Sequence, residues 1–237
     1  MQKTIGRIAF TLFGALVALT AVLQARAQDA KTPYPNMAPL DQYLMERDAE
    51  ITLARSAAPP SIANDAEVMV FGKRGYEIAA SGKNGFVCMV LRGWTASFDD
   101  PVFWNPKVRG PVCLNPAAAR SFLPLVLKKA ELVSAGRSKD QMIETVSAAV
   151  SKKELPDMEP GAMSYMLSKE GYLNDDVGHW HPHLMFFAPL ADAGTWGGGL
   201  AGSPVIEAKD EVARMITFMV PVRGWSDGTP DLPAAHQ

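Results

Sequence analysis

Three of the four histidines in this chain fall within five residues, in the motif Gly178-His179-Trp180-His181-Pro182-His183. In an extended segment, side chains two residues apart point to the same face, roughly 6.6–6.8 Å apart along the strand. Two imidazoles at that spacing can reach one metal ion or one reacting group. This motif is therefore the first place in the chain to look for chemistry.

The first hypothesis for the motif is a metal site. Neutral imidazole is the commonest ligand for zinc and also binds copper. The predicted set is His179, His181 and His183, with Asp176 or its neighbour Asp175 as a further ligand or orienting group. On an ideal strand His179 and His183 would lie about 13 Å apart, so adjacent histidines make the better pairs unless Pro182 bends the segment. Such a set predicts zinc or copper as the cofactor.

Two other interpretations of the motif stay open. The histidines could act as acid–base or ligand-binding groups without a metal. They could also be structural, with His183 at the start of a buried strand and Trp180 and Pro182 in a rigid turn. The five tryptophans lie at expected loop or strand ends, where they either line a binding site or pin loops to the core: Trp94, Trp104, Trp180, Trp196 and Trp225.

No complete catalytic signature accompanies the histidines. The segment Gly197-Gly198-Gly199 lacks the Lys-Ser/Thr that follows a phosphate-binding loop, and no serine lies in a Gly-x-Ser-x-Gly motif. The sequence therefore identifies no catalytic residue, reaction or substrate, and whether the protein is an enzyme stays open. The alternative function is a non-catalytic envelope module that binds a ligand or partner through its tryptophan-bearing loops.

The first 27 residues are typical of a secretory signal peptide. Lys3 and Arg7 precede an apolar run over 8–23, and Ala25-Arg26-Ala27 has the small-x-small pattern of a cleavage site. The run is shorter than the roughly 20 residues that span a membrane. We therefore predict cleavage after Ala27 and a soluble periplasmic or secreted protein without a membrane span.

Removal of this peptide leaves a mildly acidic chain. The mature sequence has 20 Lys and Arg against 25 Asp and Glu, a net charge of −5. A basic surface for nucleic acid is not indicated, and a small molecule or an envelope protein is the expected partner. The remaining length fits one domain.

Cys88 and Cys113 are the only cysteines. In an oxidising compartment an even cysteine count favours a structural disulfide, and there is no Cys-x-x-Cys pattern of a redox or metal site. We predict that these two residues are bridged.

The remaining patterns predict an α+β fold with a mainly antiparallel sheet, a helical hairpin covering it and an N-terminal helix. A flexible lead-in covers 28–38, a single domain 39–226 and a polar tail 227–237. The expected helices are 40–57, one from Asn115 to Gly136 that kinks or restarts at Pro124, and one that Ser138 and Gln141 open with a capping box. The expected strands are 67–71, 76–80, 85–91, 163–167, 183–188 and 214–222.

Four specific motifs spread over the mature chain carry a family resemblance. They are Gly85-Phe86-Val87-Cys88, Phe103-Trp104-Asn105-Pro106-Lys107, Cys113-Leu114-Asn115-Pro116-Ala117-Ala118-Ala119-Arg120 and the histidine motif. Together they resemble a family of uncharacterised exported bacterial proteins. The resemblance implies export but no activity, catalytic residue or cofactor.

Overall fold

The computed structural model describes residues 33–176 and 178–231. The predicted signal peptide, residues 1–27, lies outside the described residues. Contacts divide the chain into Met1–Pro35 and Asn36–Gln237, and the fold described here is that of the second unit. In the described residues no helix has the length and hydropathy needed to cross a membrane.

The second unit is built on one eight-stranded sheet with the order β2-β1-β3-β4-β5-β6-β8-β7. The β1–β3 pair is parallel and the other neighbouring pairs are antiparallel, so the predicted α+β fold with a mainly antiparallel sheet is confirmed. The strands are β1 Glu67–Gly72, β2 Gly75–Ala80, β3 Val87–Leu91, β4 Gly110–Leu114, β5 Met163–Met166, β6 His183–Pro189, β7 Ile206–Asp210 and β8 Met215–Pro221.

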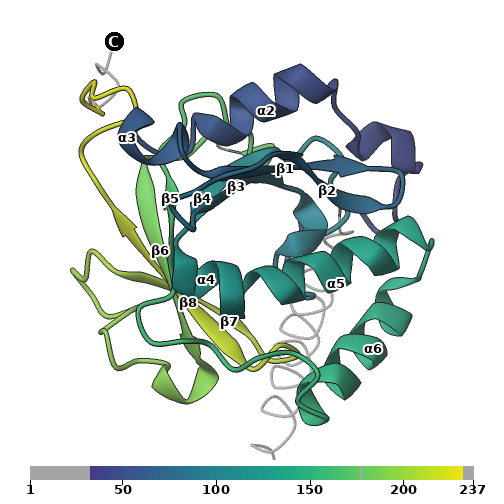
Figure 1. Ribbon diagram of the computed structural model, residues 1–237. Coiled ribbons are helices and arrows are strands. Elements are labelled where there is room, and N and C mark those ends of the chain that lie inside the picture. Colours follow the sequence, from purple (N-terminus) through teal and green to yellow (C-terminus); the bar gives the residue numbers. More distant parts are fainter. Residues whose placement is uncertain (1–32, 177, 232–237) are drawn as a thin grey trace, which may run out of the picture. The chain divides into compact units, whose positions relative to one another are not determined.

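The sheet is bowed, and helices lie on both of its faces (Figure 1). On the outer face, α2 (Arg47–Arg55) packs against β1, β3 and β4. On the inner face, α4 (Pro116–Ser121) contacts β4 and β5, while α5 (Leu123–Ser134) packs against the edge strand β2. Because both faces are covered at its centre, all five residues of β3 are buried, as its uninterrupted apolar run predicts.

Helix α5 also reaches the opposite edge of the sheet. The Lys129 ammonium, 1% exposed, lies 3.4 Å from a carboxylate oxygen of Asp210 in β7 and donates a 2.7 Å hydrogen bond to the carbonyl of Ala96. Burial lowers the pKa of Lys129, and Asp210 opposes that shift. One helix thus contacts both edge strands of the sheet, β2 and β7.

The predicted helix over 40–57 is shorter in the structure. Leu40–Tyr43 forms the 3₁₀ helix η1, Leu44 is extended, and α2 begins at Arg47. Glu46 caps α2 because its carboxylate accepts hydrogen bonds from the next backbone N–H groups. A short helix, α3 (Pro60–Ala63), begins at the second residue of the pair Pro59-Pro60.

Both helices of the pair begin where their caps predict. Asn115 accepts a hydrogen bond from the Ala118 N–H, and Pro124 lies in the first turn of α5, so the helix restarts there rather than kinking. Ser138 and Gln141 form the predicted capping box of α6 (Lys139–Ser151). It is α5 that covers the sheet, with α6 packed against α5.

Two strands were not predicted from the sequence. Strand β4 begins with Gly110-Pro111, inside a segment whose prolines suggested a loop, and it pairs with β3 along its full length. Strand β7 is a largely exposed edge strand with the sequence Ile-Glu-Ala-Lys-Asp, which lacks a buried apolar face. The remaining short 3₁₀ helices are η2 (Gly93–Thr95) and η3 (Leu190–Asp192).

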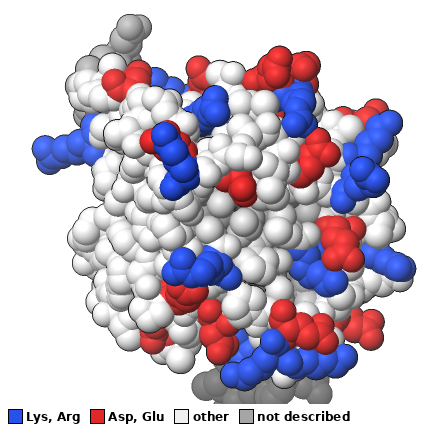
Figure 2. All heavy atoms as spheres, viewed as in Figure 1, with Lys and Arg blue, Asp and Glu red and all other residues white. Residues whose placement is uncertain are grey.

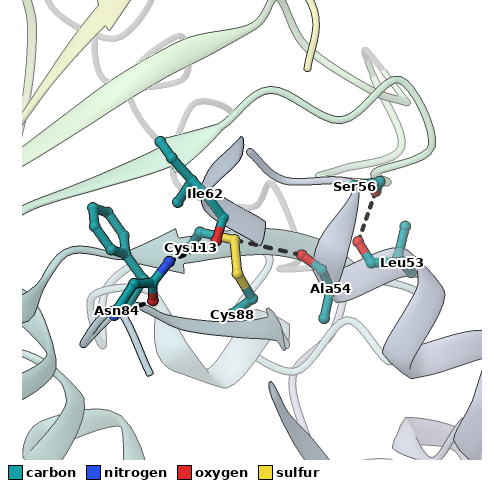
Figure 3. The surroundings of a disulfide bond; sticks show 8 residues. Leu53, Ala54, Ser56, Ile62, Asn84, Cys88 and Cys113 are labelled. Atoms are coloured by element: carbon teal, nitrogen blue, oxygen red, sulfur yellow. Dashed lines mark hydrogen bonds between the residues drawn. A yellow bond between two sulfur atoms is a disulfide. The ribbon is translucent and has the colours of Figure 1, made fainter. Parts of the chain in front are cut away.

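Cys88 and Cys113 form the predicted disulfide. They lie directly opposite each other on β3 and β4, fully buried in the core beneath α2. Figure 3 shows the bridge beside the Ala54 carbonyl of α2, to which the Cys113 sulfur makes a 3.8 Å contact. The covalent bond thus joins two central strands where the N-terminal helix packs on them.

Candidate functional site

His183 is the first residue of β6 and the most enclosed histidine of the motif. Only 3% of its surface is exposed, and its ring lies 4.6 Å from that of Trp180. Its Nδ1 atom is 2.7 Å from the backbone carbonyl oxygen of His181. Since a carbonyl oxygen only accepts hydrogen bonds, Nδ1 must carry the proton.

This hydrogen bond fixes the chemical character of His183. Burial lowers the pKa of the imidazole below its ordinary value near 6.5, and the bond to the His181 carbonyl only partly opposes that shift. The ring is therefore neutral at neutral pH, with its second nitrogen, Nε2, unprotonated. An unprotonated Nε2 is a hydrogen-bond acceptor and a base.

A small cleft lies beside His183 and encloses about 10 Å³. That is about the space that one water molecule needs, so the cleft accommodates one polar group rather than a whole ligand. Its walls combine aromatic rings with small and apolar side chains: Pro111, Met166, Ser168, Gly171, Leu173, His179, Trp180 and His183. Two of the three clustered imidazoles, His179 and His183, thus meet at one cleft.

His181 points to a different partner. Its Nδ1 atom lies 2.6 Å from a carboxylate oxygen of Asp231. The Asp231 backbone N–H also donates to the Arg223 carbonyl, so the beginning of the predicted polar tail folds back on the domain. His179 is exposed, and its ring lies 5.6 Å from that of Trp225.

The predicted aspartates do not line this cleft. Asp175 pairs with Lys107 at 2.9 Å and accepts a short hydrogen bond from Tyr172. Asp176 is exposed, and its backbone N–H donates to the side chain of Asn174.

The described structure does not assemble the predicted metal site. Within residues 33–176 and 178–231, no three His, Cys, Asp or Glu side chains are grouped so as to hold a metal ion. The set of His179, His181, His183 and Asp176 is therefore not such a group in this structure. The physical reason is placement: His179 and His183 line the cleft, whereas His181 and Asp176 do not.

The tryptophans divide between core and surface. Trp94, Trp104 and Trp225 are buried, so they hold loops onto the core and do not line an open site. Trp180 is half-buried at the histidine cleft, and Trp196 is 46% exposed.

Sequence reasoning missed Ser168 and Asp231 as neighbours of the motif. Ser168 lines the cleft, and its hydroxyl is 2.6 Å from that of Ser56 and accepts a hydrogen bond from the Glu170 N–H. Asp231 lies 50 residues from His181. Neither is part of a motif, and only the pairing of β5, β6 and β8 brings these segments together.

No family model, curated protein or solved structure matches the chain. The resemblance to uncharacterised exported proteins stays a prediction.

Proposed function

We propose that this protein acts outside the cytoplasm through a histidine-based site, where His183 accepts a hydrogen bond from a small hydroxyl- or amine-bearing ligand. One observation carries the proposal: His183 lines the cleft and its Nδ1–H is committed to the His181 carbonyl, which leaves Nε2 unprotonated. The donor group of the ligand would occupy the space of about one water molecule.

The neighbouring rings would hold the rest of the ligand. Trp180 is half-buried and His179 exposed, so both present planar surface next to the cleft. In the described residues, no hydrogen bond joins His183 to a serine hydroxyl, and the Ser168 hydroxyl is paired with Ser56. Because a nucleophile–base pair is not assembled, the geometry favours ligand binding over covalent catalysis.

The tautomer of His183 gives the first test. Long-range ¹H–¹⁵N NMR at pH 7 should show one imidazole with its proton fixed on Nδ1 and with an unprotonated Nε2. Its signal should disappear in His183→Asn. A proton on Nε2 would refute the proposal.

Ligand-observed NMR with monosaccharides, polyols and small amines extends this test to binding. His183→Asn retains a donor near the position of Nδ1 but removes the acceptor at Nε2, so binding should be lost. His183→Gln places an amide oxygen near the position of Nε2, so this variant should retain part of the ligand binding. The exposed Asp176→Asn serves as the matched control and should leave binding unchanged. Equal binding by His183→Asn and wild type would contradict the proposal.

Export is tested separately. Mass spectrometry of the protein made in its own host should find Gln28, free or cyclised, as the first residue, because the signal peptidase pattern ends at Ala27. An intact Met1 terminus in the membrane fraction would refute the predicted cleavage.

A second candidate function is partner binding through Trp196. Its ring stacks on Phe218 with centroids 4.7 Å apart and planes within 2°, so it is held rigidly although 46% exposed. Leu200 in the same connection and Ile206, the first residue of β7, are also exposed. Figure 2 shows a charge-poor area on the side where the β6–β7 connection lies in Figure 1. Rigid, exposed tryptophans are frequent anchors of interfaces.

A further inference from the structure

A second concave site, separate from the histidine cleft, lies beside the C-terminal end of α6. It is a groove of about 750 Å³, and it shares no lining residue with the cleft. Four segments form it: α4 and α5, residues 150–158, residues 189–191 and the turn before β8. Its size falls in the range of sites for small molecules.

Apolar side chains form part of the groove wall, and polar side chains, among them Ser121, Ser151 and Asp157, form the rest. Leu125 comes from α5, Val150 from α6, Leu155 and Met158 from the following segment, and Leu190 from η3. Apolar surface that stays accessible in a groove provides favourable burial for an alkyl chain.

The two basic residues that line the groove have an unusual backbone conformation. Lys153 (φ 56°) and Arg214 (φ 54°) are the only non-glycine residues with positive φ in the part of the chain that is described, and both line the groove. At ten other positions of positive φ the chain has glycine. A side chain in this region of φ is destabilising, and such outliers concentrate at functional sites.

Local structure explains why glycine would be expected at these positions. Lys153 follows the end of α6, where its N–H bonds the Val150 carbonyl and the next N–H bonds the Ala149 carbonyl. This is the Schellman arrangement, whose left-handed residue is usually glycine. Arg214 ends the turn between β7 and β8, and its carbonyl accepts a hydrogen bond from Leu190. The fold therefore does not need a cation at either place.

The charges of these two residues are weakly compensated. Lys153 has one ion pair, 3.5 Å from Asp157, and both side chains are at least 80% exposed, so the pair is weak. In the described residues, Arg214 has no carboxylate within ion-pair distance. A groove with an apolar part and two such cations attracts a ligand that is apolar along its length and negative at one end.

We propose that this groove binds a single-chain amphiphile with one anionic head group. The alkyl chain lies against Leu125, Val150, Leu155, Met158 and Leu190, and the head group meets Lys153 and Arg214. The proposal is independent of the histidine site, because the two sites have no residue in common.

Calorimetric titration of the mature protein with decanoate, dodecanoate and dodecyl phosphate, each below its critical micelle concentration, tests the proposal. Both kinds of anion should bind with one-to-one stoichiometry, and the two carboxylates should differ by about fourfold in affinity per methylene. A preference for dodecanoate or for dodecyl phosphate identifies the head group as carboxylate or phosphate. Dodecyltrimethylammonium is the control with reversed charge. The proposal would be overturned if dodecyltrimethylammonium bound as tightly as dodecanoate. It would also be overturned if none of the anions showed saturable binding.

The double variant Lys153→Gly/Arg214→Gly locates the site. Glycine suits both φ angles, so the thermal midpoint should stay equal or rise while the dissociation constant for dodecanoate rises at least tenfold. Lys152→Ala, which removes an adjacent cation outside the groove lining, should change the dissociation constant less than twofold. Unchanged dodecanoate binding by the double glycine variant would overturn the assignment. If that variant fails to fold, Ala191→Trp, which fills the groove from its wall, takes its place and should abolish binding.

Discussion

Replacing both Cys88 and Cys113 by valine should lower the free energy of unfolding by about 3.5 kcal/mol. The bridge joins residues 25 positions apart, and closing a loop of that length removes chain entropy from the unfolded state. Both side chains are 0% exposed, and valine preserves most of their volume. The loss therefore reports mainly the covalent link. Urea unfolding without a reductant measures it.

Single substitutions distinguish the contribution of the disulfide bond to stability from that of the packing around it. Cys113→Val alone should lose nearly as much stability as the double variant, because either change breaks the same bridge. Adding a reductant should lower the stability of the wild type and leave that of the double variant unchanged. A double variant within 1 kcal/mol of wild type, or two free thiols in the unfolded, non-reduced wild type, would contradict the prediction.

The fold was predictable where local patterns decide the structure. The Asn115 cap, the Ser138 capping box and the apolar run of β3 each have a local physical cause, and each element is present. The polar edge strand β7 was not predictable, because its pairing with β8 follows from the position of a neighbour. The same holds for β4, whose Pro111 suggested a loop although the strand pairs with β3.

The candidate site was predictable only in part. The spacing favoured pairs of adjacent histidines, because His179 and His183 would lie about 13 Å apart on an ideal strand. In the structure it is His179 and His183 that line one cleft, while His181 pairs with Asp231. No local pattern signals this interaction, because Asp231 follows β8 and lies 50 residues after His181 in the sequence. Long-range side-chain partners, and hence the distinction between a metal site and a binding cleft, depend on the assembled sheet.

A buried ion pair connects the N-terminal helix to the sheet. Arg92, just after β3, donates a 2.8 Å hydrogen bond to Glu50 of α2, and the two side chains are 0% and 1% exposed. Glu50 also accepts a hydrogen bond from the Phe71 N–H in β1, and Arg92 donates to the carbonyls of Tyr43 and Val90. Each charge is thus satisfied only while the other elements stay in place.

Glu50→Gln should lower the free energy of unfolding by about 3–5 kcal/mol, because it leaves the Arg92 guanidinium buried without a counter-charge. Helix α2 supplies its own control. Arg47 and Glu77 are 2.7 Å apart but about half exposed, so Glu77→Gln should cost less than about 1 kcal/mol.

A double-mutant cycle of Glu50→Gln with Arg92→Met should give a coupling energy of about 1–3 kcal/mol. Urea unfolding with the disulfide intact measures the four proteins of the cycle and Glu77→Gln. If Glu50→Gln and Glu77→Gln cost the same, burial is not what makes the inner pair important, and α2 is held to the sheet by its apolar contacts alone.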